Sequence, residues 1–208
     1  VRPQFIGTGR PLDPRRRRVV SVLVATGAIN TIGHFCHEHH PLLAAFWRGD
    51  LPECLGVIGF PTCTPEGILV HHTATGPQAA SDDFARIDGF HRSRGFCTFW
   101  RLRTYHIGYH YLVRSDGEVE AGRPERCQGA HAGSLADNRR LLGVAVAGDF
   151  TTSNHPPDVQ LGSLRALIRL LCGRYDIRKE RVLPHRTVVP TTECPGRSFP
   201  WADFLASL

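Results

Sequence analysis

The stretch Ile68-Leu69-Val70-His71-His72-Thr73 is an apolar run that ends in two adjacent histidines. An apolar run of this length is typical of a buried strand, and the end of such a strand is where a rigid sheet can present a ligand to a cleft. Because successive side chains of a strand point to opposite faces, His72 is expected to point away from the side that His71 occupies. The stretch therefore predicts a buried strand that carries a histidine to a functional site.

Two further segments contain side chains suited to the same site. One is Gly108-Tyr109-His110-Tyr111, and the other places His185 and Cys194 nine residues apart in a segment rich in Pro and Thr. Imidazole and thiolate are the usual ligands of zinc. Three protein ligands plus water form a catalytic site, whereas four protein ligands form a closed structural one. Together with the first stretch, these segments predict one zinc site with an open coordination position.

The segments also carry a family resemblance. In their order, they resemble the zinc N-acetylmuramoyl-L-alanine amidases of the phage-lysozyme type and the peptidoglycan recognition proteins that share their fold. Each segment alone is a weak signal, but their common order over roughly residues 67 to 204 is a strong one. The matching text is Val70-His71-His72-Thr73-Ala74, Gly108-Tyr109-His110-Tyr111, Asp116 to Arg123, Gly129-Ala130-His131-Ala132-Gly133, Leu142-Gly143-Val144, Gly148-Asp149-Phe150, His185-Arg186 and Thr192-Glu193-Cys194-Pro195-Gly196.

By position in these motifs, the resemblance implies that His71, His185 and Cys194 bind zinc. It also implies that Tyr109 is a catalytic group whose phenol stabilises a developing oxyanion through a hydrogen bond. Thr192 is a second catalytic candidate and stands where the phage enzyme carries a lysine. A threonine hydroxyl can donate a hydrogen bond but is not a cation. The sequence therefore leaves open which groups donate and accept protons in the reaction.

Three other residues are candidates for substrate binding: His131, Arg123 and His72. His131 is expected to line the cleft and to contact substrate. The planar guanidinium of Arg123 could bind a peptide carboxylate or form a structural salt bridge, for which the nearby Glu120 is a candidate partner.

The resemblance implies hydrolysis of the amide between N-acetylmuramic acid and L-alanine in peptidoglycan. A metal suits this reaction because it lowers the pKa of water and polarises the carbonyl. The alternative is a recognition module that binds peptidoglycan or a muropeptide without cutting it. A third alternative is a zinc peptidase that acts on the stem peptide. A complete ligand set favours cutting.

The composition is that of a soluble globular protein, and 208 residues suffice for one domain plus an extension. The formal net charge of +6 suggests an acidic partner such as a nucleic acid, an anionic lipid surface or a cell-wall polymer. A soluble basic surface with no such partner is the alternative. No nucleic-acid-binding motif accompanies the charge, which argues against nucleic acid. We expect a monomer.

Seven cysteines are many for a reduced cytosolic protein. If Cys194 binds metal, an even number remains, which permits three disulfides and favours an extracytoplasmic compartment. The alternative is unpaired thiols, some of them buried as small apolar residues. The six remaining cysteines are Cys36, Cys54, Cys63, Cys97, Cys127 and Cys172, and Cys54 is close enough to Cys63 in sequence to suggest a pair.

Residues 1–66 are interpreted as an N-terminal extension that precedes a catalytic domain of residues 67–208. A basic run at residues 15–18 and an apolar stretch at 19–32 have the layout of a secretory signal. They are also compatible with membrane association through residues 15–32, or with an element packed on the domain. Residues 34–40 contain four histidines and a cysteine and could bind a second metal, although a solvated loop also explains them.

The remaining pattern predicts an α/β protein with a central mixed β-sheet flanked by helices. Alternation around Ser115-Asp116-Gly117 predicts an antiparallel hairpin. The aromatic and arginine-rich residues 96–105 are expected to form a cleft wall. The expected strands are 68–71, 109–114, 118–121 and 143–147, and the expected helices begin near 81, span 159–175 and close the chain within 199–208.

Overall fold

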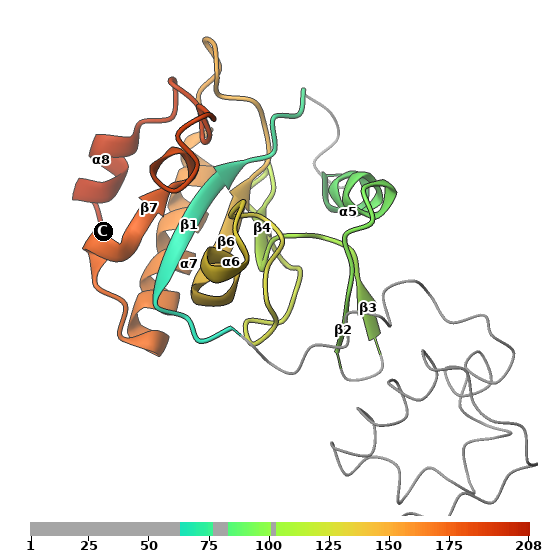
Figure 1. Ribbon diagram of the computed structural model, residues 1–208. Coiled ribbons are helices and arrows are strands. Elements are labelled where there is room, and N and C mark those ends of the chain that lie inside the picture. The colour runs from blue at the N-terminus through green and yellow to red at the C-terminus, as the bar shows by residue number, and fades with distance from the viewer. Residues whose placement is uncertain (1–62, 77–82, 101–102) are drawn as a thin grey trace, which may run out of the picture. The chain divides into compact units, whose positions relative to one another are not determined.

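The computed structural model describes residues 63–76, 83–100 and 103–208 (Figure 1). The apolar stretch 19–32, the histidine-rich residues 34–40 and nearly all of the expected extension lie outside the described residues, so the expectations for them stay predictions. Among the described residues, no helix has the length and apolar character needed to cross a membrane.

A five-stranded mixed sheet forms the centre of the described fold (Figure 1). Its order is β5 (Val119–Ala121), β4 (Tyr111–Val113), β6 (Leu141–Val146), β1 (Gly67–His72) and β7 (Val182–Pro184). β4, β6, β1 and β7 run parallel, and β5 pairs antiparallel with β4. The predicted mixed sheet with flanking helices is confirmed, and β1 is a central strand with a parallel neighbour on each side.

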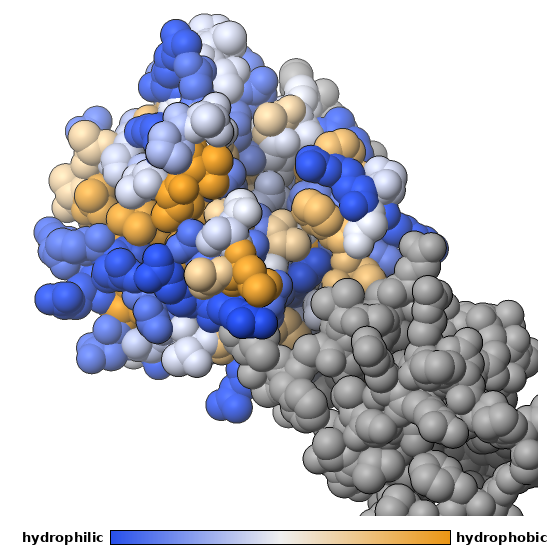
Figure 2. Space-filling view, viewed as in Figure 1, coloured by the Kyte–Doolittle hydropathy of each residue, from blue (hydrophilic) through white to orange (hydrophobic). Residues whose placement is uncertain are grey.

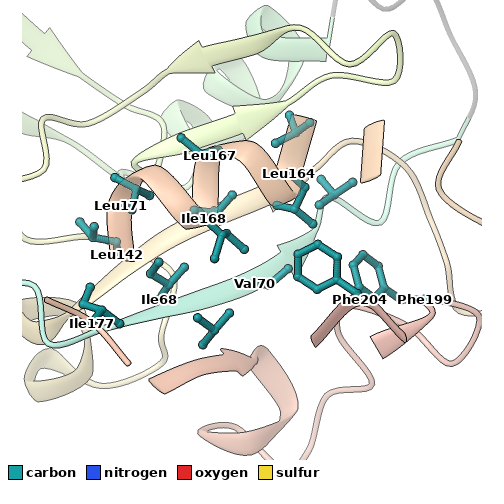
Figure 3. Packing of buried hydrophobic residues seen from close by; sticks show 14 of the residues in the cluster. Ile68, Val70, Leu142, Leu164, Leu167, Ile168, Leu171, Ile177, Phe199 and Phe204 are labelled. Carbon is teal, nitrogen blue, oxygen red and sulfur yellow. The ribbon is translucent and has the colours of Figure 1, made fainter. Parts of the chain in front are cut away.

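One face of the sheet packs against the helix α7 (Asp158–Tyr175) and the C-terminal helix α8 (Trp201–Ala206). Figure 3 shows Ile68 and Val70 of β1 in one cluster with the side chains of α7. The helical spacing of the apolar residues in α7 produces this contact, because residues three and four apart share a helix face. The α7 residues in the cluster are Leu164, Leu167, Ile168 and Leu171.

The opposite face of the sheet carries the alternate residues of β1, Leu69 and His71. Leu69 packs with Ala132 and Leu141, and Leu183 and Val188 lie against this group. The helix α6 (Leu135–Arg140) precedes β6, and the short 3-10 helix η4 (His185–Thr187) follows β7. This face therefore receives the loop before α6 and the segment after β7, which brings distant parts of the sequence beside His71.

The helix α5 (Asp83–Ser93) covers the same face farther along the sheet, where its Phe84 packs against a cluster of Leu112, Ala145 and Ala147. The Asp83 carboxylate in the first turn of α5 accepts hydrogen bonds from the backbone N–H and the hydroxyl of Ser115. These bonds tie the start of α5 to the turn of the predicted hairpin, which is formed by β4 and β5.

The aromatic and arginine-rich segment 96–105 contains a separate antiparallel pair of short strands, β2 (Thr98–Trp100) and β3 (Arg103–Tyr105). Another short 3-10 helix, η3 (Lys179–Arg181), leads into β7. On the face drawn in Figure 2, hydrophilic residues surround smaller hydrophobic areas. This distribution fits a fold that packs its apolar side chains between sheet and helices.

The expected set of three disulfides is not confirmed. Cys63, Cys97, Cys127 and Cys172 are free thiols, and Cys36 and Cys54 lie outside the described residues. Cys63 is buried in the core cluster without a bond to Cys54, so the suggested pair of these two residues is not formed. An even count of cysteines does not distinguish a disulfide framework from thiols that pack as small apolar side chains.

Candidate metal and active site

The sheet register brings His71 and His185 together. β1 and β7 pair in parallel with Val70 opposite Pro184, and each of these residues is followed by a histidine, His71 within β1 and His185 at the start of η4. The ring centroids of His71 and His185 are 4.2 Å apart. The carboxyl ends of parallel strands are where α/β sheets place their ligands, and these two imidazoles lie at that edge.

Cys194 reaches the same point from the loop that follows η4. Its Sγ accepts a hydrogen bond from the backbone N–H of His72 at 3.3 Å and lies 3.8 Å from His71 Nδ1. Its carbonyl accepts a hydrogen bond from the Arg186 N–H at 3.0 Å. The ligand atoms of His71, His185 and Cys194 all lie within 4.8 Å of one another. The three expected ligands are therefore brought together, from segments far apart in the sequence.

Burial keeps these three side chains uncharged in the protein. It lowers the pKa of His71 well below the ordinary value and lowers that of His185 to about 4. It raises the pKa of the Cys194 thiol to about 12. At neutral pH both imidazoles thus keep an unprotonated nitrogen, which is the form that binds a metal. The thiol has to release its proton to become a ligand.

Tyr109 lies beside this cluster. Its ring centroid is 5.1 Å from that of His71 and 5.2 Å from that of His91 on α5. Burial raises the pKa of Tyr109 above its ordinary value. The phenol therefore keeps its proton at neutral pH and can act as a hydrogen-bond donor next to the three expected ligands.

An open cavity of about 460 Å³ adjoins the Cys194 loop and is lined by Arg186, Pro190, Thr192, Glu193 and Arg197. Within it, Thr192 Oγ1 accepts a hydrogen bond from the Cys194 N–H at 3.2 Å. Thr192 thus faces the cavity and also holds the backbone of the expected cysteine ligand. Its catalytic role stays a prediction.

Arg123 is buried, and its polar contacts are made inside the protein. Its Nε donates to the Ile107 carbonyl at 2.6 Å, and its guanidinium also donates to the Gln128 carbonyl at 3.0 Å. The suggestion that Glu120 is the partner of Arg123 is wrong, since the Glu120 Oε1 atom pairs with the Arg114 guanidinium instead, at 3.6 Å from its Nη1. Arg123 therefore fixes the loop around residues 107–128, and its expected role in substrate binding stays a prediction.

His72 points to the face opposite His71, as the alternation of a strand predicts. Its Nδ1 accepts a hydrogen bond from the Phe150 N–H at 3.3 Å and lies 3.7 Å from the Asp149 carboxylate. The side chain is buried. The contribution of His72 to the cluster is its backbone N–H, which contacts Cys194.

His131 contacts the Nε2 side of the His71 ring, whereas Cys194 lies on the Nδ1 side. Its Nδ1 is 3.1 Å from His71 Nε2, and its Nε2 is 3.2 Å from the Leu141 carbonyl oxygen. The backbone N–H groups of His131 and Ala132 both donate to the Asn138 side chain. Sequence reasoning did not single out Asn138, because its partners are backbone groups that leave no trace in the residue pattern.

The comparisons with known proteins agree with this geometry. Residues 61–197 match the model of a family described as N-acetylmuramoyl-L-alanine amidase. The endolysin of Enterobacteria phage T3 is 32% identical over 141 residues, which cover 65% of this chain and 83% of the endolysin.

Two solved structures extend the comparison. The amidase LysC from Clostridium intestinale has a TM-score of 0.58 and 34% identity, covering 71% of this chain and 87% of LysC. Peptidoglycan recognition protein-LE, solved with tracheal cytotoxin, a monomeric diaminopimelic acid-type peptidoglycan, has a TM-score of 0.55 and 27% identity, covering 68% of this chain and 79% of that protein. The match to the family model spans most of the chain, and the chain therefore belongs to the N-acetylmuramoyl-L-alanine amidase family.

Proposed function

We propose that this protein is a zinc-dependent amidase that hydrolyses the bond between N-acetylmuramic acid and L-alanine in peptidoglycan, with His71, His185 and Cys194 as the zinc ligands. The observation that carries the proposal is the convergence of two imidazoles and one thiol within 4.8 Å. Because peptidoglycan lies outside the cytoplasm, the same proposal gives the protein an extracytoplasmic place of action.

The side chains present fit a zinc ion. The donor set of two imidazoles and one sulfur is one that zinc accepts in catalytic sites, where it leaves a fourth position open. His185 Nε2 is buried and finds no hydrogen-bond partner among the described residues. A buried polar atom without a partner costs about 1–3 kcal/mol, and coordination of a metal would remove this cost.

When bound, zinc would supply a Lewis acid that polarises the amide carbonyl and promotes the deprotonation of water. The protein's own groups supply the rest. His71 and His185 present neutral nitrogens, and the His72 N–H donates to the Cys194 sulfur, which stabilises the thiolate form. A hydrogen bond to a charged group contributes more than one to a neutral group, so this contact favours the ligand form of Cys194.

In this proposal, Tyr109 stabilises the charge that develops on the carbonyl oxygen. Its phenol keeps its proton at neutral pH, and its ring packs against His71. A donor held in place before the reaction stabilises the transition state more than the ground state. Tyr109 therefore supplies the hydrogen bond that a site with one thiolate ligand needs, because the thiolate reduces the net positive charge of the metal centre.

Peptidoglycan binding without cleavage is the competing function, and peptidoglycan recognition protein-LE, one of the structural neighbours, is solved in complex with a monomeric peptidoglycan. Mass spectrometry of digested peptidoglycan separates the two functions. The proposal expects two products: glycan whose N-acetylmuramic acid residues carry a free carboxyl group in place of the peptide, and peptides that begin with L-alanine. Binding without these products would refute the proposal, and cleaved stem peptides would indicate a peptidase.

The variant Cys194→Ala tests the ligand set in the protein of residues 1–208. We expect it to lose bound zinc, measured by mass spectrometry of the metal content, and to release no peptide, while circular dichroism shows that the fold persists. Cys97→Ala is the matched control, since Cys97 is a partly buried free thiol outside the site. Turnover by Cys194→Ala equal to that of the unmodified protein would exclude Cys194 as a ligand.

A further inference from the structure

His131 occupies a narrow slot between His71 and the start of β6. The residue is only 9% exposed. A Cβ atom added at Gly129 would lie 2.4 Å from the His131 ring, and one added at Gly143 would lie 2.5 Å from it. A real Cβ atom essentially never comes this close to a ring atom, so both positions must be glycine for the ring to lie where it does. The slot fixes the plane of the ring independently of its hydrogen bonds.

The hydrogen bonds of His131 set the direction in which protons are donated. The Leu141 carbonyl can only accept, so His131 Nε2 carries the hydrogen of that 3.2 Å contact. In a neutral imidazole the other nitrogen then has no hydrogen and is an acceptor. His131 Nδ1 therefore accepts the hydrogen of His71 Nε2 in the 3.1 Å contact between the two rings.

The consequence for His71 concerns its second nitrogen. With the hydrogen on Nε2, the neutral ring has its lone pair on Nδ1, and Nδ1 is the atom that lies 3.8 Å from Cys194 Sγ. The lone pair thus points to the place where the three expected ligands converge. Without an acceptor behind it, the His71 ring could carry its hydrogen on either nitrogen and could rotate away from Cys194.

We propose that His131 is a positioning residue, which holds His71 in the tautomer and ring orientation that binds the metal through Nδ1. This inference rests on the proposed function, and it gives His131 a role in place of substrate contact. Partners behind a ligating histidine fix its tautomer and orientation, and their loss commonly weakens metal binding about 10–100-fold. The hydrogen bonds from the backbone N–H groups of His131 and Ala132 to the Asn138 side chain hold the loop that carries the His131 ring in place.

Two substitutions at position 131 separate positioning from packing. His131→Leu fills the slot but removes the acceptor, and we expect the Kd for zinc, measured by competition with a chelator, to rise about 10–100-fold. His131→Asn keeps an oxygen near the position of Nδ1, and we expect it to recover part of that loss. A Kd in His131→Leu within about twofold of the unmodified protein would overturn the proposal, and so would equal losses in the two variants.

The variant Gly129→Ala perturbs the ring without changing a hydrogen-bonding group. Its Cβ would contact His131 at 2.4 Å, so we expect weaker zinc binding, whereas Gly162→Ala has no atom within 4 Å and is the matched control. Thermal unfolding of every variant shows whether it is folded. Unchanged zinc binding in a folded Gly129→Ala protein would contradict the role of the slot.

A measurement on the metal-free protein distinguishes failure of this inference from failure of the proposed function. In two-bond ¹H–¹⁵N correlation spectra of histidine-labelled protein, we expect His71 to carry its hydrogen on Nε2, and His131→Leu to show a mixture of tautomers. A hydrogen on His71 Nδ1 in the unmodified protein would refute the positioning role. Absence of zinc binding combined with the expected tautomer would refute the zinc proposal and leave the hydrogen-bond assignment standing.

Discussion

Replacing Tyr109 by phenylalanine removes one oxygen from the site and leaves the ring in place. The ring contacts of Tyr109 with His71 and His91, at centroid distances of 5.1 and 5.2 Å, involve no phenol oxygen. Phenylalanine can make both contacts, so zinc binding and the melting temperature are expected to stay close to those of the unmodified protein. The change therefore reports on the hydroxyl alone.

The expected loss lies in turnover. Removal of one preorganised donor to an oxyanion commonly reduces kcat about 100–1000-fold, or about 3–4 kcal/mol. The hydroxyl would bond the developing charge and contribute little to ground-state binding, so KM should change much less than kcat. The assay measures release of the L-alanine-led peptide from a defined muropeptide over a range of concentrations, in zinc-loaded protein.

A matched control is Tyr105→Phe, because Tyr105 lies on β3 and packs against Arg103 instead of the histidine cluster. We expect no change in kcat for this variant. A kcat of Tyr109→Phe within about threefold of the unmodified value would refute the donor role, since it is far below the 100-fold loss expected for an oxyanion donor. A raised KM with unchanged kcat would instead assign Tyr109 to substrate binding.

Two further predictions concern stability. Ile168→Ala should lower the free energy of unfolding by about 2–5 kcal/mol, because Ile168 is fully buried against the sheet. Leu170 lies on the exposed side of α7, so Leu170→Ala should change the free energy of unfolding by less than about 0.5 kcal/mol. Similar losses for the two variants in urea unfolding would contradict the assignment of the faces of α7. Burial lowers the pKa of His110 from 6.5 to about 4, so the unfolded state binds more protons and stability falls as the pH drops from 6.5 toward 4, by about 2 kcal/mol at pH 5. His110→Asn should reduce this loss between pH 7 and pH 5, and an equal loss in the variant would exclude His110 as its source.

Much of the fold could be predicted because its signals are local. The apolar run before His71 predicted β1, and the alternation of a strand predicted that His72 faces the other side. Helical spacing predicted α7 to within one residue of its start. The local sequence pattern predicts the secondary structure and the face to which each side chain points, because both follow from the backbone geometry of a few consecutive residues.

The contacts that hold the site were not predictable in the same way. His131 meets His71 across 60 residues of sequence, and its ring depends on the space left by Gly129 and Gly143. Arg123 binds two backbone carbonyls, which any residue offers, so the sequence suggested the neighbouring Glu120 instead. Hydrogen-bond partners on the backbone, and the space available to a ring, are set by tertiary packing. They therefore leave no signal in the sequence that identifies the contact.

The adjacent histidines of β1 show how one strand can serve a site twice. The His71 side chain joins the cluster, while the backbone N–H of His72 donates to the sulfur of Cys194. A shift of one residue in the pairing of β1 would exchange the two faces of the strand, which would move the imidazole away from Cys194 and His185. The register of β1 with β6 and β7 therefore determines both the packing of the sheet and the arrangement of the three ligands. For this reason the site requires no separate scaffold: the interactions that bury Ile68 and Val70 against α7 also orient His71 toward the opposite side.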